Sequence, residues 1–193
     1  MKRTLSILLI LVLAVGLFSC KDIKGTRGKP GGLGVGDRAY EFKLMDANGN
    51  WVRMSDVQEG WYLVLVLFRG SWCEACLTQL TRFKQDIDRF SELKAGIACA
   101  SVEPVSDLAE FQRQWRFPFP ILADPQLRLT DAYGARHPKG HGADDISRPC
   151  VVIIDPDRIV RYKYIGANPH DHPHNAEILS LIRKFKAVPP VQP

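Results

Sequence analysis

The sequence predicts an α/β fold in which a central mixed sheet is flanked by helices. Two near-continuous apolar runs, 61–68 (WYLVLVLF) and 95–102 (AGIACASV), are typical of strands buried on both faces. Segments with helical periodicity follow both runs, and residues 150–166 (CVVIIDPDRIVRYKYIG) predict a hairpin that turns at 155–157. Strands that alternate with helices indicate a sheet covered on both faces.

The segments on either side of the first buried run also have clear patterns. Residues 40–57 predict two short strands around a turn at Asn48–Gly49. After the run, apolar residues recur at three- and four-residue spacing. These residues predict one face of an amphipathic helix and are Leu77, Leu80, Phe83, Ile87 and Phe90.

Three more helices are expected in the second half of the chain. Segment 106–115 predicts a helix capped by Ser106. Segment 123–134 predicts a helix capped by Asp124, with a proline in its first turn. The last amphipathic pattern covers 175–185.

The N-terminal residues have the pattern of a targeting signal. A basic start at 2–3 precedes an apolar run at 5–18, which is shorter than the about 20 residues that span a bilayer. The run ends in LFSC (17–20), which resembles the lipobox of bacterial lipoproteins. The resemblance implies that 1–19 is a signal peptide and that Cys20 is lipidated. An ordinary secretory signal and an uncleaved anchor remain alternatives.

We therefore expect four segments along the chain. After the signal peptide, Gly-rich residues 20–34 predict a flexible tether, 35–187 a single folded domain, and 188–193 a Pro-rich tail. The protein is expected in the cell envelope, bound by its lipid to the extracytoplasmic side of a membrane, where disulfides persist. Which membrane carries it stays open.

Composition limits the class of partner. A chain of 193 residues is long enough for one domain with a sizeable core. The formal net charge of +5 is mild, and basic and acidic residues are interspersed. This pattern predicts no nucleic-acid partner.

The motif with the clearest chemistry is Cys73-Glu-Ala-Cys76, at the junction of the first buried strand and its helix. A C-x-x-C at such a junction is the thioredoxin arrangement. Cys73 would lie at the helix N-terminus, where free amides and the helix dipole favour a thiolate, the nucleophilic form. Cys76 would lie one turn inside the helix and resolve a mixed disulfide. Cys73 is expected to be the exposed member of the pair.

Two other interpretations of the pair remain open. A structural zinc site needs four ligands, and no second C-x-x-C is present, although His170, His172 and His174 form a dense loop segment. A purely structural disulfide would close so short a loop that it would constrain the unfolded chain little. We expect redox chemistry without a metal or another bound cofactor.

Glu74 lies between the cysteines and has two possible effects. Its carboxylate would raise the pKa of a neighbouring thiol, because like charges oppose ionisation. A higher thiol pKa makes a pair more reducing. Alternatively, Glu74 is an exposed residue that favours the start of the helix and has little redox effect.

Several segments resemble the thioredoxin superfamily and, within it, the alkyl hydroperoxide reductase/thiol-specific antioxidant family. They are VGDRAYEFKLMDANGN (35–50), FRGSWCEACLTQL (68–80), FPFPILADPQLRLTDAYGA (117–135) and VVIIDPDRIVRY (151–162). The resemblance covers most of 35–187 and implies a single thioredoxin-like domain. It further implies a thiol-dependent oxidoreductase whose partners are protein thiols or disulfides and a recycling reductant.

The resemblance also assigns supporting residues. Pro149 falls where thioredoxins place a cis-proline that faces the cysteine pair. Arg148 would then lie near Cys73, where it could lower the thiol pKa or bind an anionic substrate. Arg69 could act similarly, and Trp72 flanks the pair.

Departures from the family pattern bear on activity. Peroxide-reducing members carry Pro-x-x-x-Thr-x-x-Cys, but with Cys76 at the last position, Arg69 and Cys73 replace the proline and the threonine. This difference favours thiol–disulfide exchange, with a thiol-dependent peroxidase as the alternative and a metal-delivery module as a third reading. The acid that thioredoxins bury six residues before the first cysteine is Leu67 here.

Two further cysteines lie in the predicted strands. Cys99, in an apolar strand, is expected to be a small core residue. Cys150 adjoins Pro149 and is either another core residue or an additional resolving or redox-sensing thiol.

Overall fold

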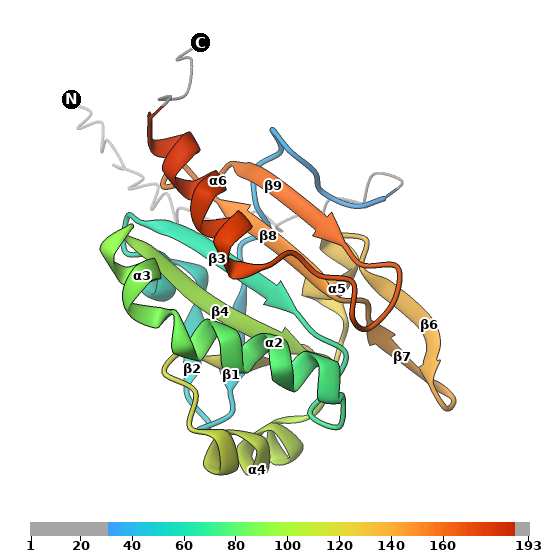
Figure 1. Ribbon diagram of the computed structural model, residues 1–193. Coiled ribbons are helices and arrows are strands. Elements are labelled where there is room, and N and C mark those ends of the chain that lie inside the picture. The colour runs from blue at the N-terminus through green and yellow to red at the C-terminus, as the bar shows by residue number, and fades with distance from the viewer. Residues whose placement is uncertain (1–30, 188–193) are drawn as a thin grey trace, which may run out of the picture.

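The computed structural model describes residues 31–187 (Figure 1). The expected signal peptide, the lipidation site Cys20, most of the tether and the tail at 188–193 lie outside the described residues. No helix between residues 31 and 187 is both long and apolar enough to cross a membrane.

The centre of the fold is a seven-stranded mixed sheet in the order β2-β1-β5-β4-β3-β8-β9. Its strands are β1 (Lys43–Asp46), β2 (Trp51–Arg53), β3 (Tyr62–Leu67), β4 (Ala95–Ser101), β5 (Ile121–Ala123), β8 (Cys150–Ile154) and β9 (Val160–Ile165). Strand β3 runs parallel to β4 and antiparallel to β8. All six residues of β3 are buried, because both faces of the central strand are covered. The predicted α/β class with a mixed sheet is confirmed.

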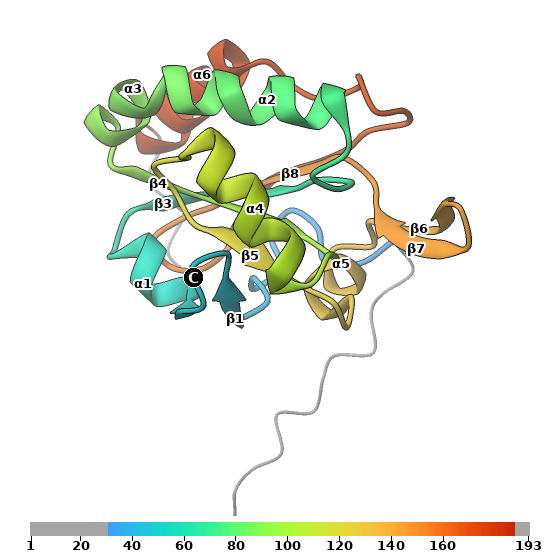
Figure 2. The ribbon, with the colours of Figure 1, turned by 90° about the horizontal axis from the view of Figure 1, so that it is seen from below.

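Helices cover both faces of the sheet (Figure 2). They are α1 (Met54–Gln58), α2 (Glu74–Gln85), α3 (Ile87–Glu92), α4 (Val105–Trp115), α5 (Arg128–Ala132) and α6 (Asn175–Ala187). Side chains of α2, α3, α4 and α6 share one apolar cluster with one face of the sheet. Side chains of α1 and α5 belong to a second cluster on the other face.

The helix expected to run through 77–90 is divided in two at Asp86. The Asp86 carboxylate accepts hydrogen bonds from Arg89 Nη1 and Asn175 Nδ2, each at 2.8 Å. These hydrogen bonds lower the pKa of Asp86. Asp86 therefore links the break between α2 and α3 to Asn175, the first residue of α6.

The two predicted caps differ from the structure in different ways. Helix α4 begins at Val105 after Pro104, and the Ser106 hydroxyl donates to Asp107, so the predicted Ser106 cap is wrong. Helix α5 begins only at Arg128, but Asp124 still accepts hydrogen bonds from the backbone N–H groups of its first turns. Asp124 thus caps α5 with its buried carboxylate, although it lies several residues before the helix begins.

A polar hairpin that the sequence did not predict extends from the sheet (Figure 1). Strands β6 (Arg136–His141) and β7 (Asp144–Ser147) form their own two-stranded sheet. Arg136 fixes this hairpin through ion pairs to Asp131 and Asp145.

The last residues of the expected tether contact the domain. Leu33 N–H donates to Ala132 O at 2.7 Å, and Lys163 Nζ donates to Gly31 O at 2.7 Å. A Cβ at Gly32 would lie 2.3 Å from the backbone of Tyr133, so this close approach requires glycine.

Candidate active site

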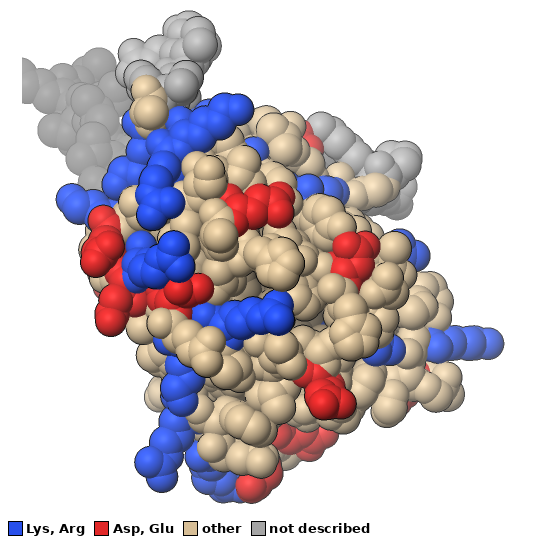
Figure 3. All heavy atoms as spheres, viewed as in Figure 1, with Lys and Arg blue, Asp and Glu red and all other residues tan. Residues whose placement is uncertain are grey.

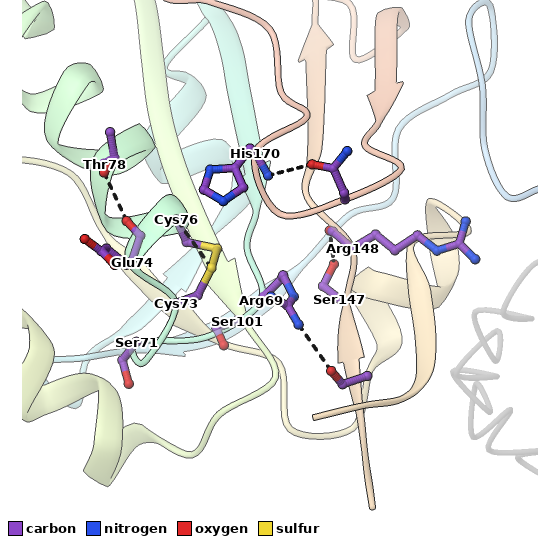
Figure 4. The surroundings of a disulfide bond; sticks show 12 residues. Arg69, Ser71, Cys73, Glu74, Cys76, Thr78, Ser101, Ser147, Arg148 and His170 are labelled. Carbon is purple, nitrogen blue, oxygen red and sulfur yellow. Dashed lines mark hydrogen bonds between the residues drawn. A yellow bond between two sulfur atoms is a disulfide. The ribbon is translucent and has the colours of Figure 1, made fainter. Parts of the chain in front are cut away.

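The cysteine pair lies where the central strand passes into α2. Cys73 is the N-cap residue of α2, and its Sγ accepts a hydrogen bond from Cys76 N–H at 3.3 Å. The two sulfurs form a disulfide, with Cα atoms 5.2 Å apart (Figure 4). The Cys73 sulfur therefore lies within the field of the helix N-terminus, which stabilises negative charge.

Both cysteines are buried in this oxidised form. Cys73 is 5% exposed and Cys76 2% exposed, whereas the neighbouring Trp72 is 41% exposed. The expectation that Cys73 is exposed is therefore wrong for the bridged pair. The disulfide packs into the same apolar cluster as α2 and α4, which leaves the tryptophan at the surface.

A carboxylate that sequence reasoning missed holds the turn before Cys73. Glu103 accepts hydrogen bonds from Ser71 N–H and Ser71 Oγ, both at 2.7 Å, and from Ser101 Oγ at 3.0 Å. Ser71 and Ser101 both lie beside the disulfide in Figure 4. The parallel strands β3 and β4 end at the same edge, so a polar residue just after β4 could have been suspected from the sequence.

The Trp72 ring contacts the guanidinium of Arg69 and the imidazole ring of His141. The Arg69 guanidinium carbon lies 4.9 Å from the Trp72 ring centroid. The His141 ring stacks on Trp72 at 3.9 Å, with 16° between the planes. Arg69 Nη2 also donates to Gly140 O at 3.2 Å, so the β6–β7 hairpin is attached directly to the tryptophan beside Cys73.

The supporting residues Arg148 and Pro149 differ from expectation. No peptide bond is cis within residues 31–187, so the predicted cis bond at Pro149 is wrong. Pro149 is buried, and its carbonyl accepts a hydrogen bond from Gly166 N–H at 2.7 Å, which extends the β8–β9 pairing. The exposed side chain of Arg148 points away from the disulfide (Figure 4), so the expected contact with Cys73 is not made.

Glu74 is exposed on the first turn of α2. Together with Arg82 and the loop histidines His170, His172 and His174, it lines a hollow of about 400 Å³. Across the described ranges, no three His, Cys, Asp or Glu side chains are placed to hold a metal ion.

The remaining described cysteines are buried thiols. Cys99 is fully buried in the cluster that contains the disulfide, as a core residue should be. Cys150 belongs to the cluster on the opposite face of the sheet, and burial raises its thiol pKa to about 12. The structure thus favours the core interpretation of Cys150 over a resolving thiol.

A C-x-x-C disulfide at the N-terminus of a helix that follows the central strand of a mixed sheet defines a thioredoxin-fold redox protein. Residues 35–163 match the AhpC/TSA family, and the chain belongs to this family. It is a thiol-dependent oxidoreductase.

The relatives of this chain include a thiol-disulfide oxidoreductase and a peroxiredoxin. The chain is 28% identical over 129 residues to the thiol-disulfide oxidoreductase ResA of Bacillus subtilis, covering 66% of this chain and 69% of that protein. It is 26% identical over 167 residues to peroxiredoxin 2 of Caldanaerobacter subterraneus subsp. tengcongensis, covering 81% and 74%. The fold resembles the crystal structure of peroxidoxin BcpB from Mycobacterium tuberculosis, with a TM-score of 0.71 and 24% identity over 79% of this chain and 98% of that one.

Proposed function

We propose that the protein is a thiol–disulfide oxidoreductase that uses the Cys73–Cys76 couple in the cell envelope. The observation that carries this proposal is the Cys73 sulfur at the N-terminus of α2, bridged to Cys76. The Cys76 N–H donates to this sulfur, and such a hydrogen bond favours the thiolate over the thiol.

In the reducing direction, the Cys73 thiolate attacks one sulfur of a substrate disulfide. That disulfide bond breaks, the departing thiolate takes a proton from water, and a mixed disulfide joins Cys73 to the substrate. Cys76 loses its proton and attacks the Cys73 sulfur, which releases the second substrate thiolate and forms the Cys73–Cys76 disulfide. Two electrons have then passed to the substrate, and a dithiol reductant must restore the pair.

The same cysteines support a second candidate function, a thiol-dependent peroxidase. Similarity to peroxiredoxins favours it. Against it, Arg69 and Cys73 occupy the positions of the proline and threonine that the peroxide pocket requires, and Cys76 is 2% exposed.

The envelope location rests on the N-terminal segment, with its short apolar run and Cys20. Wild-type protein should incorporate labelled palmitate, whereas Cys20→Ala should not, because the thiol that would carry the lipid is absent. A Cys20→Ala variant that takes up as much label as the wild type would contradict lipidation at Cys20.

The roles of the cysteines can be tested by trapping. Cys76→Ser should accumulate a mixed disulfide with a substrate, visible by mass spectrometry as an adduct on Cys73, because the resolving thiol is absent. Cys73→Ser should form no adduct, and wild-type protein should turn over. Rapid oxidation by hydrogen peroxide that Cys76→Ser abolishes would instead establish the peroxidase.

A further inference from the structure

A hollow of about 360 Å³ lies beside the segment that leads into β8. Three side chains from different parts of the chain line it: Arg69 after β3, His137 on β6 and Arg148 before β8. Pro149 and the loop 166–169 after β9 complete its wall. Its size lies within the range of small-ligand pockets.

The charge of this hollow is of one sign. Two guanidinium groups and one imidazole contribute to its lining, and no Asp or Glu among the described residues does. The adjacent hollow against Trp72 contrasts with it, because Glu103, Asp107, Asp144 and Asp145 line that one. These four carboxylates therefore line the hollow against Trp72 and not the one beside Pro149.

The positive charges in the hollow are not neutralised by the fold. Arg148 is exposed and makes no ion pair with any residue between 31 and 187. Arg69 makes one hydrogen bond, to Gly140 O, and a guanidinium carries five N–H donors. Planar groups of this kind bind carboxylates through paired hydrogen bonds.

Arg69 connects the hollow to the redox pair. One side of its guanidinium stacks over Trp72, which directly precedes Cys73, while Arg69 also lines the hollow. An anionic group in the hollow would therefore contact Arg69, whose guanidinium stacks on the residue next to Cys73. This offset suits a substrate whose carboxylate is separated from its sulfur by several bonds.

We propose that the hollow formed by Arg69, His137 and Arg148 binds the carboxylate of a low-molecular-weight disulfide substrate while its sulfur meets Cys73. The proposal deepens the thiol–disulfide oxidoreductase function and rests on it. The covalent steps are those given above. The hollow would orient the substrate disulfide towards Cys73 and favour substrates with a negative charge.

The test compares three small disulfides as oxidants of the reduced protein: glutathione disulfide with carboxylates, bis(2-hydroxyethyl) disulfide without charge, and cystamine with ammonium groups. Oxidation is followed by stopped-flow tryptophan fluorescence, since Trp72 adjoins Cys73. The wild-type rate constants should fall in the order in which the disulfides are named. Arg148→Gln should lower the ratio of the glutathione rate to the neutral rate about fivefold, the equivalent of about one kcal/mol for an exposed ion pair.

Two further variants make the test specific. Arg148→Lys should recover part of the ratio, because charge is kept and the planar fork is lost. Arg128→Gln removes an exposed arginine of α5 that does not line this hollow, and it should leave all three rates unchanged. An equal effect of Arg128→Gln would show that only the overall charge matters and would overturn the proposal.

Failure of the inference and failure of the proposed function give different results. Wild-type protein that oxidises no faster than a free thiol with the three small disulfides and with the peptide disulfides described below would refute the proposed function. Rapid oxidation without charge preference would refute the hollow alone. Peptide disulfides with Glu or Lys beside the cysteine form a separate arm. A preference confined to these peptides would assign the carboxylate to a protein substrate and refute the small-molecule assignment.

Discussion

Glu103 is the residue that joins the end of β4 to the turn before the cysteine pair. Its carboxylate receives three hydrogen bonds, two from Ser71 and one from Ser101. Hydrogen bonds to a charged group stabilise more than neutral ones, and leaving their donors unpaired costs free energy. The conformation of the turn therefore depends on one side chain 30 residues beyond Cys73.

We expect Glu103→Ala to lower the free energy of unfolding by about 2 kcal/mol, because Ser71 N–H and two hydroxyl groups lose their acceptor. Urea denaturation followed by circular dichroism measures the change. Glu110→Ala is the matched control, since Glu110 is an exposed glutamate whose recorded partner is Arg113 on the same helix. Equal small losses in the two variants would show that the Glu103 hydrogen bonds contribute little.

His172 makes stability depend on pH. Burial, the charge of Arg82 and the neighbouring histidines lower its pKa below the usual 6.5, and Nδ1 is buried without a hydrogen-bond partner among the described groups. Below pH 6.5 the unfolded chain therefore binds more protons at this residue than the folded chain does. Its contribution to stability is complete above pH 6.5 and is lost as the pH falls towards the lower, folded pKa.

The corresponding prediction concerns the slope of stability against pH. His172→Asn should flatten the fall in unfolding free energy between about pH 6.5 and pH 5, because the variant has no group to protonate there. Urea midpoints at several pH values measure this slope. His170→Asn should reduce the slope much less, because the charge of His170 is the smallest of the causes that lower the pKa of His172. A wild-type slope in His172→Asn would contradict the assignment.

At the scale of elements, the β6–β7 hairpin forms one wall of the site. It contacts the redox turn through the His141–Trp72 stack and the hydrogen bond from Arg69 to Gly140 O. These contacts place His137 beside the hollow with Arg69 and Arg148. The hairpin thus contributes lining residues to two hollows, one against Trp72 and one beside Pro149.

Loss of the stack should release the hairpin without unfolding the domain. We expect His141→Ala to raise amide hydrogen exchange across 136–147 about fivefold, because an aromatic pair contributes about 1 kcal/mol. Mass spectrometry of exchanged peptides measures this, and β3 should stay fully protected. Asp144→Ala, an exposed position on the same hairpin, should have no such effect. Unchanged exchange in His141→Ala would show that the Arg136 ion pairs alone fix the hairpin.

The whole molecule is stabilised by two apolar clusters on opposite faces of one sheet. Basic and acidic side chains both occur on the face drawn in Figure 3. The disulfide, by contrast, joins residues only three apart in sequence and closes a very short loop. Global stability should therefore depend on the clusters far more than on the redox state.

Reduction of the pair should lower the unfolding free energy by at most about 2 kcal/mol, the chain-entropy contribution of so short a loop. Urea denaturation with and without a dithiol reductant measures the difference, with Cys73→Ser as the control that reductant should not affect. A loss several times larger would identify the bridge as structural and would contradict a redox couple.

Local patterns in the sequence were sufficient for the main framework. The buried strands β3 and β4, the β8–β9 hairpin and α6 each carry a continuous apolar run or a clear helical period, so their type could be predicted. The position of Cys73 at a helix start followed from the same patterns, because the strand ends just before the motif and the helical period begins just after it.

The contacts around the pair were not predictable in this way. The β6–β7 hairpin is polar and has no clear period, and its contacts reach Trp72 and Arg69, about 70 residues earlier. Glu103 likewise acts on Ser71 across two neighbouring strands. The backbone around Pro149 is likewise held by distant partners, since Arg148 N–H donates to Ala135 O and Gly166 N–H donates to Pro149 O.

The sequence by itself thus determined the fold class, the order of the principal strands and helices, and the cysteine pair at a strand–helix junction. The tertiary structure alone decided that Cys73 is buried, that Glu103 holds its turn, and that Arg148 joins Arg69 and His137 away from the sulfurs. The physical reason is the separation of the interacting residues along the chain. Periodicity and capping act between near neighbours in the sequence, whereas the site is made by side chains that only the packed sheet and its hairpin bring together.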